Sequence, residues 1–485
     1  MSSKLDLLLV NPSGKKQMEE GLCQSLSGIE PPFWAGLLAS FIRRLGYQVN
    51  LIDGEADNLS PAETAARVED FKPLLVAIVV QGVNPSASST TKMPAARELL
   101  KAIDGRFKTI LVGLHPSALP ERTLNEETAD FVCQGEGFYT IPELLKGLKL
   151  GQGGWKIPGL YMKGYKENGR ADLVSASYLP SVAWDLIDVT KYRAHNWHCL
   201  DDLDKRSPYA VIYTNLGCPY RCQYCNIHTL YSGNKPSVRL RPPESVIEEI
   251  DLLVDKYDVR NLKIMDELFT LNEQRVSRIC QPLIERGYNL NIWAYAGIDN
   301  VTKEMLHDMK QAGINWLCYG IEAADPGVRL GMGKGFGQAR ISSVVEMTRE
   351  AGINIIANFI FGLPGDSKES MRESLNMMKE YNFEYVNLYC AMAYPGSSLY
   401  DITLKGGQEL PQSWAGYAQL GYETQPLAND QMTAAEVLAF RDRAFNEYFS
   451  RREYLSMVKQ KFGQKAVEHV KEMLKHKIKR RLLGD

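Results

Sequence analysis

Short apolar runs alternate with amphipathic helical patterns in two separate blocks of this chain. Strands that are apolar on both faces and are separated by helices are typical of a parallel sheet with helices on either side. The first block therefore predicts a doubly wound, Rossmann-like α/β domain over residues 1–150, and a Gly-, Trp- and Pro-rich linker follows over 151–208. Its expected strands lie at 5–11, 48–53, 74–81, 109–113 and 130–134.

The second block repeats the alternation six times between residues 209 and 400. Six β/α units at this spacing predict a partial (β/α)6 barrel of the TIM type, whose chemistry belongs at the carboxyl ends of the strands. Residues 401–485 predict a mostly helical end. The expected barrel strands lie at 209–215, 261–266, 290–296, 315–321, 353–361 and 384–391.

Composition excludes several classes of function. The chain has 485 residues, with 56 Lys and Arg against 58 Asp and Glu, so no excess of positive charge favours nucleic acid. No apolar stretch approaches the roughly 20 residues of a membrane helix. A cytoplasmic, reducing location follows, where the nine cysteines should not form a disulfide framework. The basic stretch "KHKIKRRLLGD" (475–485) is expected to be a solvated helix end.

Three cysteines gather in "TNLGCPYRCQYCNIH" (214–228), directly after the first barrel strand. Cys218, Cys222 and Cys225 suit an iron–sulfur cube in which one iron keeps no protein ligand and can bind a small molecule. Structural zinc, the alternative, normally takes four protein ligands. His228 is close and Cys199 lies upstream, but neither completes a standard zinc-binding spacing.

The spacing C-x3-C-x2-C, with the aromatic Tyr224 before the last cysteine, resembles the signature of the radical S-adenosylmethionine (SAM) superfamily. The resemblance implies a [4Fe–4S] cluster on the three cysteines and SAM on the open iron. One electron from a donor such as flavodoxin or ferredoxin would then cleave SAM to methionine and a 5′-deoxyadenosyl radical, which abstracts a hydrogen atom. The protein positions the reactants and excludes water.

Later barrel segments resemble the same family in order along the chain. They are "IMDELF" (264–269), "YGIEAAD" (319–325), "NFIFGLPGDS" (358–367) and "AYPGSSLYD" (393–401). The resemblance implies SAM contacts by Tyr224, Asp266, Glu267, Glu322, Phe361 and Gly362.

One position departs from the family, because Gly297 stands where relatives often carry arginine. The glycines of "GMGKGFG" (331–337) lack the spacing of a phosphate-binding P-loop, although Lys334 could face the cofactor. His115, His195 and His198 have no second ligand at a metal-binding spacing, so we expect structural or solvated histidines.

No G-x-G-x-x-G follows the first strand, which argues against a dinucleotide site. The front domain instead resembles the cobalamin-binding domain of one radical SAM class, through "NPSG" (11–14), residues 31–53, "GLHPSALP" (113–120) and residues 133–145. No Asp-x-His-x-x-Gly occurs, so bound cobalt should lack that axial histidine; a domain that keeps its shape without the cofactor is the alternative. The residues implied for cobalamin are Asn11, Pro12, Gln81, Gly82, Val83, Gly113, His115, Gln134, Gly135 and Glu136.

The combined resemblance implies a cobalamin-dependent radical SAM methyltransferase that acts on an unactivated carbon of a small molecule. No nucleic-acid or membrane partner is expected, and no motif indicates the residues that act on the substrate. The alternatives are a radical cyclase, epimerase or rearrangement enzyme, with or without cobalamin, and a non-enzymatic sensor that binds a corrinoid or zinc.

Overall fold

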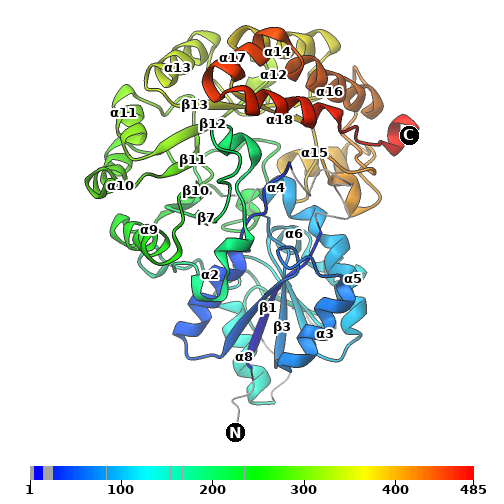
Figure 1. Ribbon diagram of the computed structural model, residues 1–485. Helices are drawn as coiled ribbons and strands as arrows, with labels where there is room; N and C mark the ends of the chain where they lie inside the picture. The colour runs from blue at the N-terminus through cyan, green and yellow to red at the C-terminus, as the bar shows by residue number, and fades with distance from the viewer. Residues whose placement is uncertain (1–4, 15–25, 83–84, 152–155, 165–167, 234) are drawn as a thin grey trace.

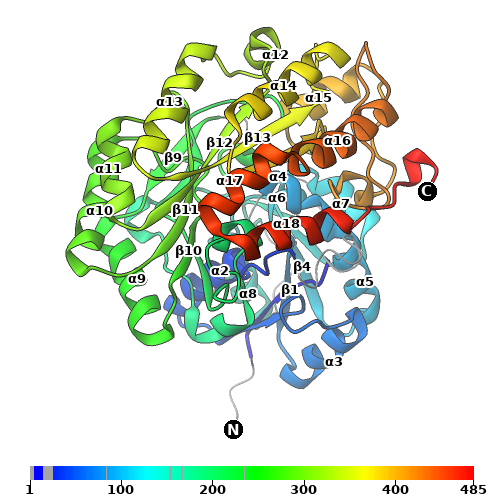
Figure 2. The same ribbon diagram turned by 45° about the horizontal axis from the view of Figure 1, so that its top comes forward.

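The computed structural model describes residues 5–14, 26–82, 85–151, 156–164, 168–233 and 235–485. Two sheets form the molecule, each covered by helices. In Figure 1 the first, blue and cyan, lies below the green and yellow second sheet, and the red C-terminal helices run across the upper part. The turned view of Figure 2 shows the strands of the second sheet inside a curved row of helices. The predicted α/β class, with a doubly wound domain, a partial barrel and a helical end, is confirmed.

The front sheet has the strand order β2-β1-β3-β4-β5-β6. The first five strands are parallel, and a helical crossover connects each of them to the next along the chain. Their apolar runs are buried on both faces, as Leu7, Leu8 and Leu9 of β1 illustrate. The strands are β1 (Leu7–Asn11), β2 (Val49–Asp53), β3 (Leu75–Val79), β4 (Lys108–Val112), β5 (Phe131–Cys133) and the antiparallel β6 (Leu160–Met162).

Helices cover both faces of this sheet. Local signals set their ends: Ser60 and Glu63 form a capping box at the start of α3, and Lys72 ends that helix in the left-handed conformation. The helices are α2 (Phe33–Arg44), α3 (Pro61–Phe71), α4 (Pro85–Ser88), α5 (Met93–Ile103), α6 (Leu114–Ala118), α7 (Pro120–Glu126) and α8 (Thr140–Lys149).

The second sheet is entirely parallel and has the order β14-β13-β12-β11-β10-β7. Its edges are β7 and β14, so the barrel is open between these two strands. The strands are β7 (Tyr209–Ile212), β10 (Asn261–Ile264), β11 (Asn291–Ala296), β12 (Ile314–Glu322), β13 (Asn354–Phe361) and β14 (Tyr385–Cys390). The helices between them are α9 (Pro243–Tyr257), α10 (Glu273–Arg286), α11 (Lys303–Gln311), α12 (Pro326–Gly331), α13 (Gln338–Glu350) and α14 (Lys368–Tyr381).

Two further parts complete the chain. An antiparallel hairpin of β8 (Asn215–Cys218) and β9 (Ser237–Leu240) forms its own sheet after β7. The C-terminal part contains α15 (Ser398–Lys405), α16 (Ala434–Phe449), α17 (Arg452–Phe462) and α18 (Gln464–Lys475). Among the described residues, no helix is both long enough and apolar enough to cross a membrane.

Buried ion pairs connect the front domain to the barrel and to the hairpin. Lys263 of β10, which is fully buried, lies 3.0 Å from Glu30 in the segment before α2. Arg239 of β9 pairs with Glu136 in the loop after β5. The region between the sheets contributes β6 to the front sheet and otherwise forms short 3-10 turns, including η3 (Trp184–Leu186) and η5 (Asn196–Cys199). The carboxyl ends of the two sheets therefore meet across a fixed interface.

Candidate functional site

The three-cysteine loop begins where the hairpin strand β8 ends. Gly217 makes this start possible, since it has φ +95° and a Cβ there would lie 2.0 Å from the carbonyl oxygen of Ser237. Cys218 is the last residue of β8, and the Cys225 amide donates to the Cys222 carbonyl oxygen at 3.0 Å. These three thiols are partly exposed, whereas the other described cysteines are buried.

A cavity of about 420 Å³ lies at the carboxyl end of the barrel and has all three cysteines in its wall. The rest of the wall is mostly apolar and aromatic. It includes Phe336, Ile360, Met392, Tyr295, Tyr389 and Tyr394. The polar groups that reach the cavity are few, among them Glu267, Glu322, Lys334 and Asn358. This composition is typical of a small-molecule site, in which a few polar groups fix the orientation of a mostly apolar ligand.

Tyr224, Glu322 and Lys334 form one polar group in this wall. The Tyr224 hydroxyl donates to Glu322 Oε1 at 2.8 Å, and Lys334 Nζ lies 2.8 Å from the same oxygen. Lys334 Nζ also donates to the carbonyl oxygen of Gly320 at 2.8 Å. Glu322 holds a left-handed backbone with φ +70°, which is unfavourable for a residue with a Cβ. Unlike Lys72, it does not end a helix, and strained residues of this kind cluster at functional sites. The predicted SAM contacts Tyr224 and Glu322 are thus brought together.

Glu267 also faces the cavity, next to the cysteine hairpin. Its carboxylate accepts the Gly217 amide at 3.1 Å and the Tyr231 hydroxyl at 3.3 Å. Burial raises the pKa of Glu267 to about 7, and the neighbouring Asp266 charge adds to this rise. A cationic group of a ligand in the cavity would favour the ionised form of Glu267.

Asp266 lies outside the cavity wall, although the sequence places it beside Glu267. Its carboxylate accepts the backbone amides of Thr214 and Asn215, at 2.6 Å and 3.1 Å, and also bonds both side chains. Successive residues after a strand point in opposite directions, and here only Glu267 faces the ligand space. Asp266 therefore fixes the bend between β7 and β8.

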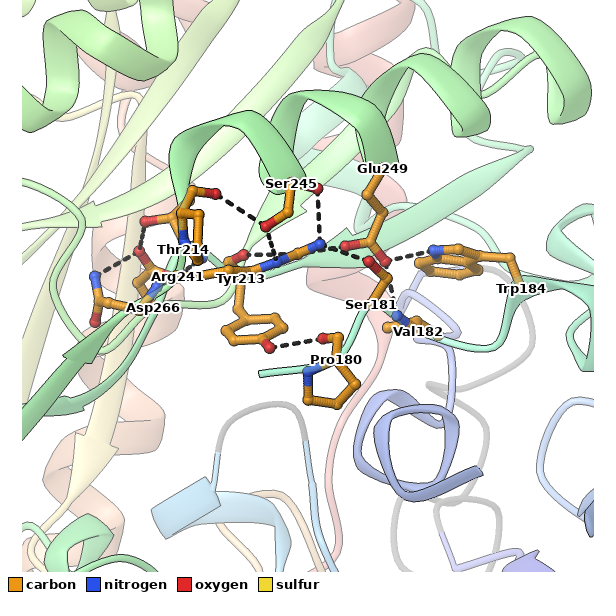
Figure 3. A network of polar contacts seen from close by, with 12 residues as sticks. Pro180, Ser181, Val182, Trp184, Tyr213, Thr214, Arg241, Ser245, Glu249 and Asp266 are labelled. Carbon is orange, nitrogen blue, oxygen red and sulfur yellow. Dashed lines mark hydrogen bonds and ion pairs between the residues drawn. The ribbon is translucent and has the colours of Figure 1, made fainter. Parts of the chain in front are cut away.

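A neighbouring network holds the same bend from the outside, as Figure 3 shows. The fully buried Arg241 pairs with Glu249 of α9 and bonds the carbonyl oxygen of Tyr213. Glu249 also accepts the amide of Val182 and the indole N–H of Trp184, at 2.9 Å and 2.7 Å. The linker, the hairpin and helix α9 thus share one buried charge network below the cysteine loop.

The fifth-strand motif reaches the cavity through different residues from those predicted. Phe361 packs against Phe440 of α16 with a ring separation of 5.0 Å, and a Cβ on Gly362 would meet Val437 of the same helix. Asn358 and Ile360 line the cavity instead. Side chains alternate across a strand, so Phe361 faces the C-terminal helices, while Gly362 follows the strand with φ +80° and also lies against α16. The period-two pattern of the strand could have indicated Asn358 and Ile360.

A second cavity, of about 800 Å³, extends from the carboxyl ends of the front strands to the interior of the barrel. Asn11, Gln81 and Gly82, three of the residues predicted to bind cobalamin, lie in its wall together with Lys92. Lys92 Nζ donates to Asn11 Oδ1 at 2.6 Å, and the Asn11 amide donates to Asp53 at 2.7 Å. Lys92, which no sequence motif indicated, thus brings a cation to the end of β1.

The other described residues predicted to bind cobalamin do not line this cavity. Pro12 is buried, and Val83 lies outside the described residues. Gly113 and Gly135 pack against backbone and Ser117, while Gln134 approaches Tyr161. Glu136 is committed to the ion pair with Arg239.

His115 is buried and packs edge-on against Trp414, with ring centres 4.4 Å apart. Burial lowers the pKa of His115 to about 3, so its ring is neutral. His198 is also buried in the core, beside Trp197, and burial lowers its pKa to about 3. Both fit the structural role predicted for them.

The basic end of the chain differs from the solvated helix end that we expected. Arg480 is buried and its guanidinium lies 2.9 Å from Asp442 of α16. The segment from His476 to Arg480 lines the second cavity. The charge pattern alone gave no indication of this, because Asp442 lies 38 residues away in the sequence.

The two cavities share part of their walls. Ala87 of the front domain and Gln419 of the C-terminal part line both. So do three barrel residues, Tyr295, Cys318 and Tyr389. Ligands in the two cavities would therefore be separated by little more than these side chains.

Two protein-family models match the chain. The model of the radical SAM superfamily matches residues 212–378, and that of the B12 binding domain matches residues 20–145. An uncharacterized methyltransferase of Pyrococcus horikoshii is 26% identical over 86% of this chain and 87% of that protein. An anaerobic magnesium-protoporphyrin IX monomethyl ester cyclase of Rubrivivax gelatinosus is 23% identical over 87% of this chain and 74% of that protein.

Solved structures share the whole architecture. The methyltransferase TsrM from Kitasatospora setae, with cobalamin and a [4Fe-4S] cluster bound, matches with a TM-score of 0.68 and 16% identity, over 92% of this chain and 89% of that one. The cobalamin-dependent enzyme OxsB, with aqua-cobalamin and SAM bound, matches with a TM-score of 0.71 and 16% identity, over 98% and 71%. The chain therefore carries a domain that matches the radical SAM superfamily, at residues 212–378, behind a B12-binding domain at residues 20–145, and it is a radical SAM enzyme.

Proposed function

We propose that this protein is a cobalamin-dependent methyltransferase that transfers a methyl group to an unactivated carbon of a small molecule. The observation that carries the proposal is the shared wall between the cysteine-lined cavity and the cavity at the front strand ends. A reaction that uses two cofactors on one substrate needs both within reach of the same atom. Tyr295, Cys318 and Tyr389 mark the place where this is possible.

The residues of the first cavity fit a cluster and SAM. Cys218, Cys222 and Cys225 would supply the three thiolates. All three thiols are partly exposed and lie in the wall of one cavity, as the ligands of a cluster with one open iron must. Glu267 would bind the amino group of SAM, and Glu322, held by Tyr224 and Lys334, would fix the rest of the molecule.

The second cavity fits a corrinoid at its front-domain end. Gly82 permits close approach of the backbone, while Asn11, Gln81 and Lys92 offer hydrogen bonds to amide and phosphate groups. His115 is the only histidine in residues 1–150, and it does not line this cavity. Among the described residues, the histidines in the cavity wall are His195 and His476.

When bound, the cluster and SAM would supply the radical that removes hydrogen, and cobalamin would supply the methyl group. The chain's own residues would orient these groups and exclude water from the space between them. The aromatic wall of Tyr295, Tyr389 and Tyr394 favours a substrate with an apolar part. An external electron donor such as flavodoxin or ferredoxin, and a cytoplasmic location, stay predictions from the sequence.

Anaerobic reconstitution with iron, sulfide and hydroxocobalamin tests the proposal. We expect a brown protein with a thiolate-to-iron absorption band and one bound corrinoid per chain. With its substrate it should yield S-adenosylhomocysteine and 5′-deoxyadenosine together, since methylation consumes SAM in both ways. A colourless protein that binds neither iron nor corrinoid would contradict the proposal.

A radical cyclisation is the second candidate, because the relative from Rubrivivax gelatinosus is a cyclase by name and aligns over 87% of this chain. Both reactions use the same cluster and SAM residues. The products separate them, since a cyclase would release 5′-deoxyadenosine without S-adenosylhomocysteine.

A further inference from the structure

The hairpin that carries Cys218 is a separate two-stranded sheet, and it is held from two sides. On the barrel side, Asp266 binds both the backbone and the side chain of Thr214 at the hairpin base (Figure 3). On the other side, Arg239 of β9 is paired with Glu136 of the front domain. The second attachment comes from a different domain and is not required to complete the barrel sheet.

The Glu136–Arg239 pair is buried, and both side chains make further hydrogen bonds. The side chains are 4% and 12% exposed. Arg239 Nη1 lies 3.1 Å from Glu136 Oε2 and 2.7 Å from the carbonyl oxygen of Val174. The Val174 amide donates to Glu136, and the Trp34 indole donates to its carbonyl oxygen at 3.2 Å. The loop after β5 therefore grips the guanidinium in a fixed position.

A continuous set of contacts leads from Arg239 to the cysteine loop. Arg239 lies opposite Leu216 in the β8–β9 ladder, two residues before Cys218. Its guanidinium lies 5.4 Å from the centre of the Tyr231 ring. The Tyr231 hydroxyl donates to Glu267, the carboxylate that faces the first cavity.

The chain of contacts ends next to a cluster ligand. Glu267 accepts the amide of Gly217, the residue before Cys218, at 3.1 Å. One ion pair and two hydrogen bonds, joined by the ring contact, thus connect a front-domain loop to the start of the cysteine loop. Glu136, one of the residues implied for cobalamin, is in direct contact with this hairpin.

We propose that Glu136 and Arg239 are positioning residues that fix the cluster-binding hairpin against the front domain and set the electrostatic potential at the cluster. The inference rests on the proposed function, because it places a cluster on Cys218, Cys222 and Cys225. It assigns Glu136 to the cluster side of the enzyme, although its sequence motif is one implied for cobalamin.

The two partners should respond differently to removal of the other. Arginine stays protonated in proteins, so Arg239 without Glu136 leaves an unpaired positive charge beside the hairpin. A positive charge stabilises the reduced, more negative cluster and moves its midpoint potential upward. Burial raises the pKa of Glu136, so this carboxyl can take up a proton when Arg239 is removed. The opposite shift should therefore be smaller.

Four full-length variants test this in anaerobically reconstituted protein. They are Glu136→Gln, Arg239→Gln, the double variant, and the control Glu384→Gln. Glu384 is an equally buried carboxylate, with its side chain 2% exposed, but it pairs with Lys461 at the amino end of β14. The midpoint potential of the cluster is measured by titration followed by electron paramagnetic resonance. Hydrogen exchange of the β8 and β9 peptides is measured on the same proteins before reconstitution.

We expect iron and sulfide content to be unchanged, since all three cysteines remain. The potential should rise in Glu136→Gln, fall by less in Arg239→Gln, and return toward wild type in the double variant. Exchange of β8 and β9 should be faster by on the order of tenfold in Glu136→Gln, because loss of one partner of a buried pair is strongly destabilising. Glu384→Gln should change neither measurement.

Equal potentials and equal exchange in wild type and Glu136→Gln would overturn the inference. So would a Glu384→Gln variant that matches Glu136→Gln in both measurements. If the wild-type protein takes up no iron and sulfide, the proposed function fails by itself. The exchange experiment still decides, in that case, whether the pair fixes the hairpin.

Discussion

The carboxyl ends of the two sheets are used in different ways. At the barrel, the loops from β8, β10 and β12 converge on one cavity and bring Cys218, Glu267 and Glu322 into its wall. At the front sheet, Asn11 and Gln81 reach a cavity, whereas the loops after β4 and β5 pack on the rest of the molecule. Strand ends converge in both sheets, but a loop that docks another domain is no longer available to a ligand.

Substitution in the cysteine loop should give the largest effect. One iron of the cluster already lacks a protein ligand, and two thiolates cannot hold the rest. Cys222→Ala is expected to lose nearly all bound iron and sulfide and all cleavage of SAM, as measured by metal analysis and product chromatography. Corrinoid binding should persist, since Asn11 and Gln81 line the other cavity. The control is Cys280→Ala, a buried cysteine of α10. Full iron content in the Cys222→Ala protein would contradict the assignment of the cluster to the cysteine loop.

A front-domain loop glycine should act through stability instead. Gly113 has φ +131°, and a Cβ there would lie 2.2 Å from the carbonyl oxygen of Val80. Gly113→Ala should therefore lower the free energy of unfolding by about 3 kcal/mol, measured by denaturant titration. Gly105→Ala, with φ +67° and open space around it, should cost only about 1 kcal/mol. Equal losses in the two variants would mean that Gly113 is not held by packing.

Substitution of Glu322 in the barrel cavity should weaken the binding of SAM. Glu322→Gln removes the charge that Tyr224 and Lys334 bind, and Lys334 is then left without its carboxylate. We expect the Kd for SAM, measured by calorimetry, to rise by about tenfold to a hundredfold. The free energy of unfolding should also fall, because Lys334 loses its partner in a buried pair. An unchanged Kd would remove Glu322 from the SAM site. Glu384→Gln again serves as the control.

The two buried histidines give the smallest effect over a single pH unit; His115 lies in the front domain and His198 in the segment before the barrel. Burial lowers the pKa of His115 and of His198 to about 3, from an ordinary value near 6.5. Below pH 6.5 the unfolded chain therefore binds protons that the folded protein does not. The free energy of unfolding should fall by about 1.4 kcal/mol per pH unit for each histidine, between pH 6.5 and about 3.

Replacement of either histidine by a ring that cannot take up a proton should remove the contribution of that histidine to the pH dependence of stability. His115→Phe and His198→Phe are each expected to flatten the acid slope of stability by about 1.4 kcal/mol per pH unit, measured by unfolding between pH 6.5 and 5. A wild-type slope in both variants would show that neither ring is buried in its neutral form.

Much of the fold followed from local pattern. Continuous apolar strands separated by capped helices predicted both sheets, and the cysteine spacing predicted the loop that lines the first cavity. Which of two adjacent residues faces the cavity was harder to predict. Asp266 and Glu267 are adjacent, yet one fixes a backbone bend and the other faces the cavity. Phe361 and Ile360 divide in the same way, because a one-residue change reverses the face of a strand.

The sequence by itself determined the order of elements, the two domains of the family and the three thiols at a strand end, since these depend on residues close together in the chain. Only the tertiary structure decided which loops face a ligand and which face another domain. Glu136 meets Arg239 across 103 residues, and Arg480 meets Asp442 across 38. Such pairs depend on how separate elements pack, and neither the spacing nor the composition of a single segment carries that information.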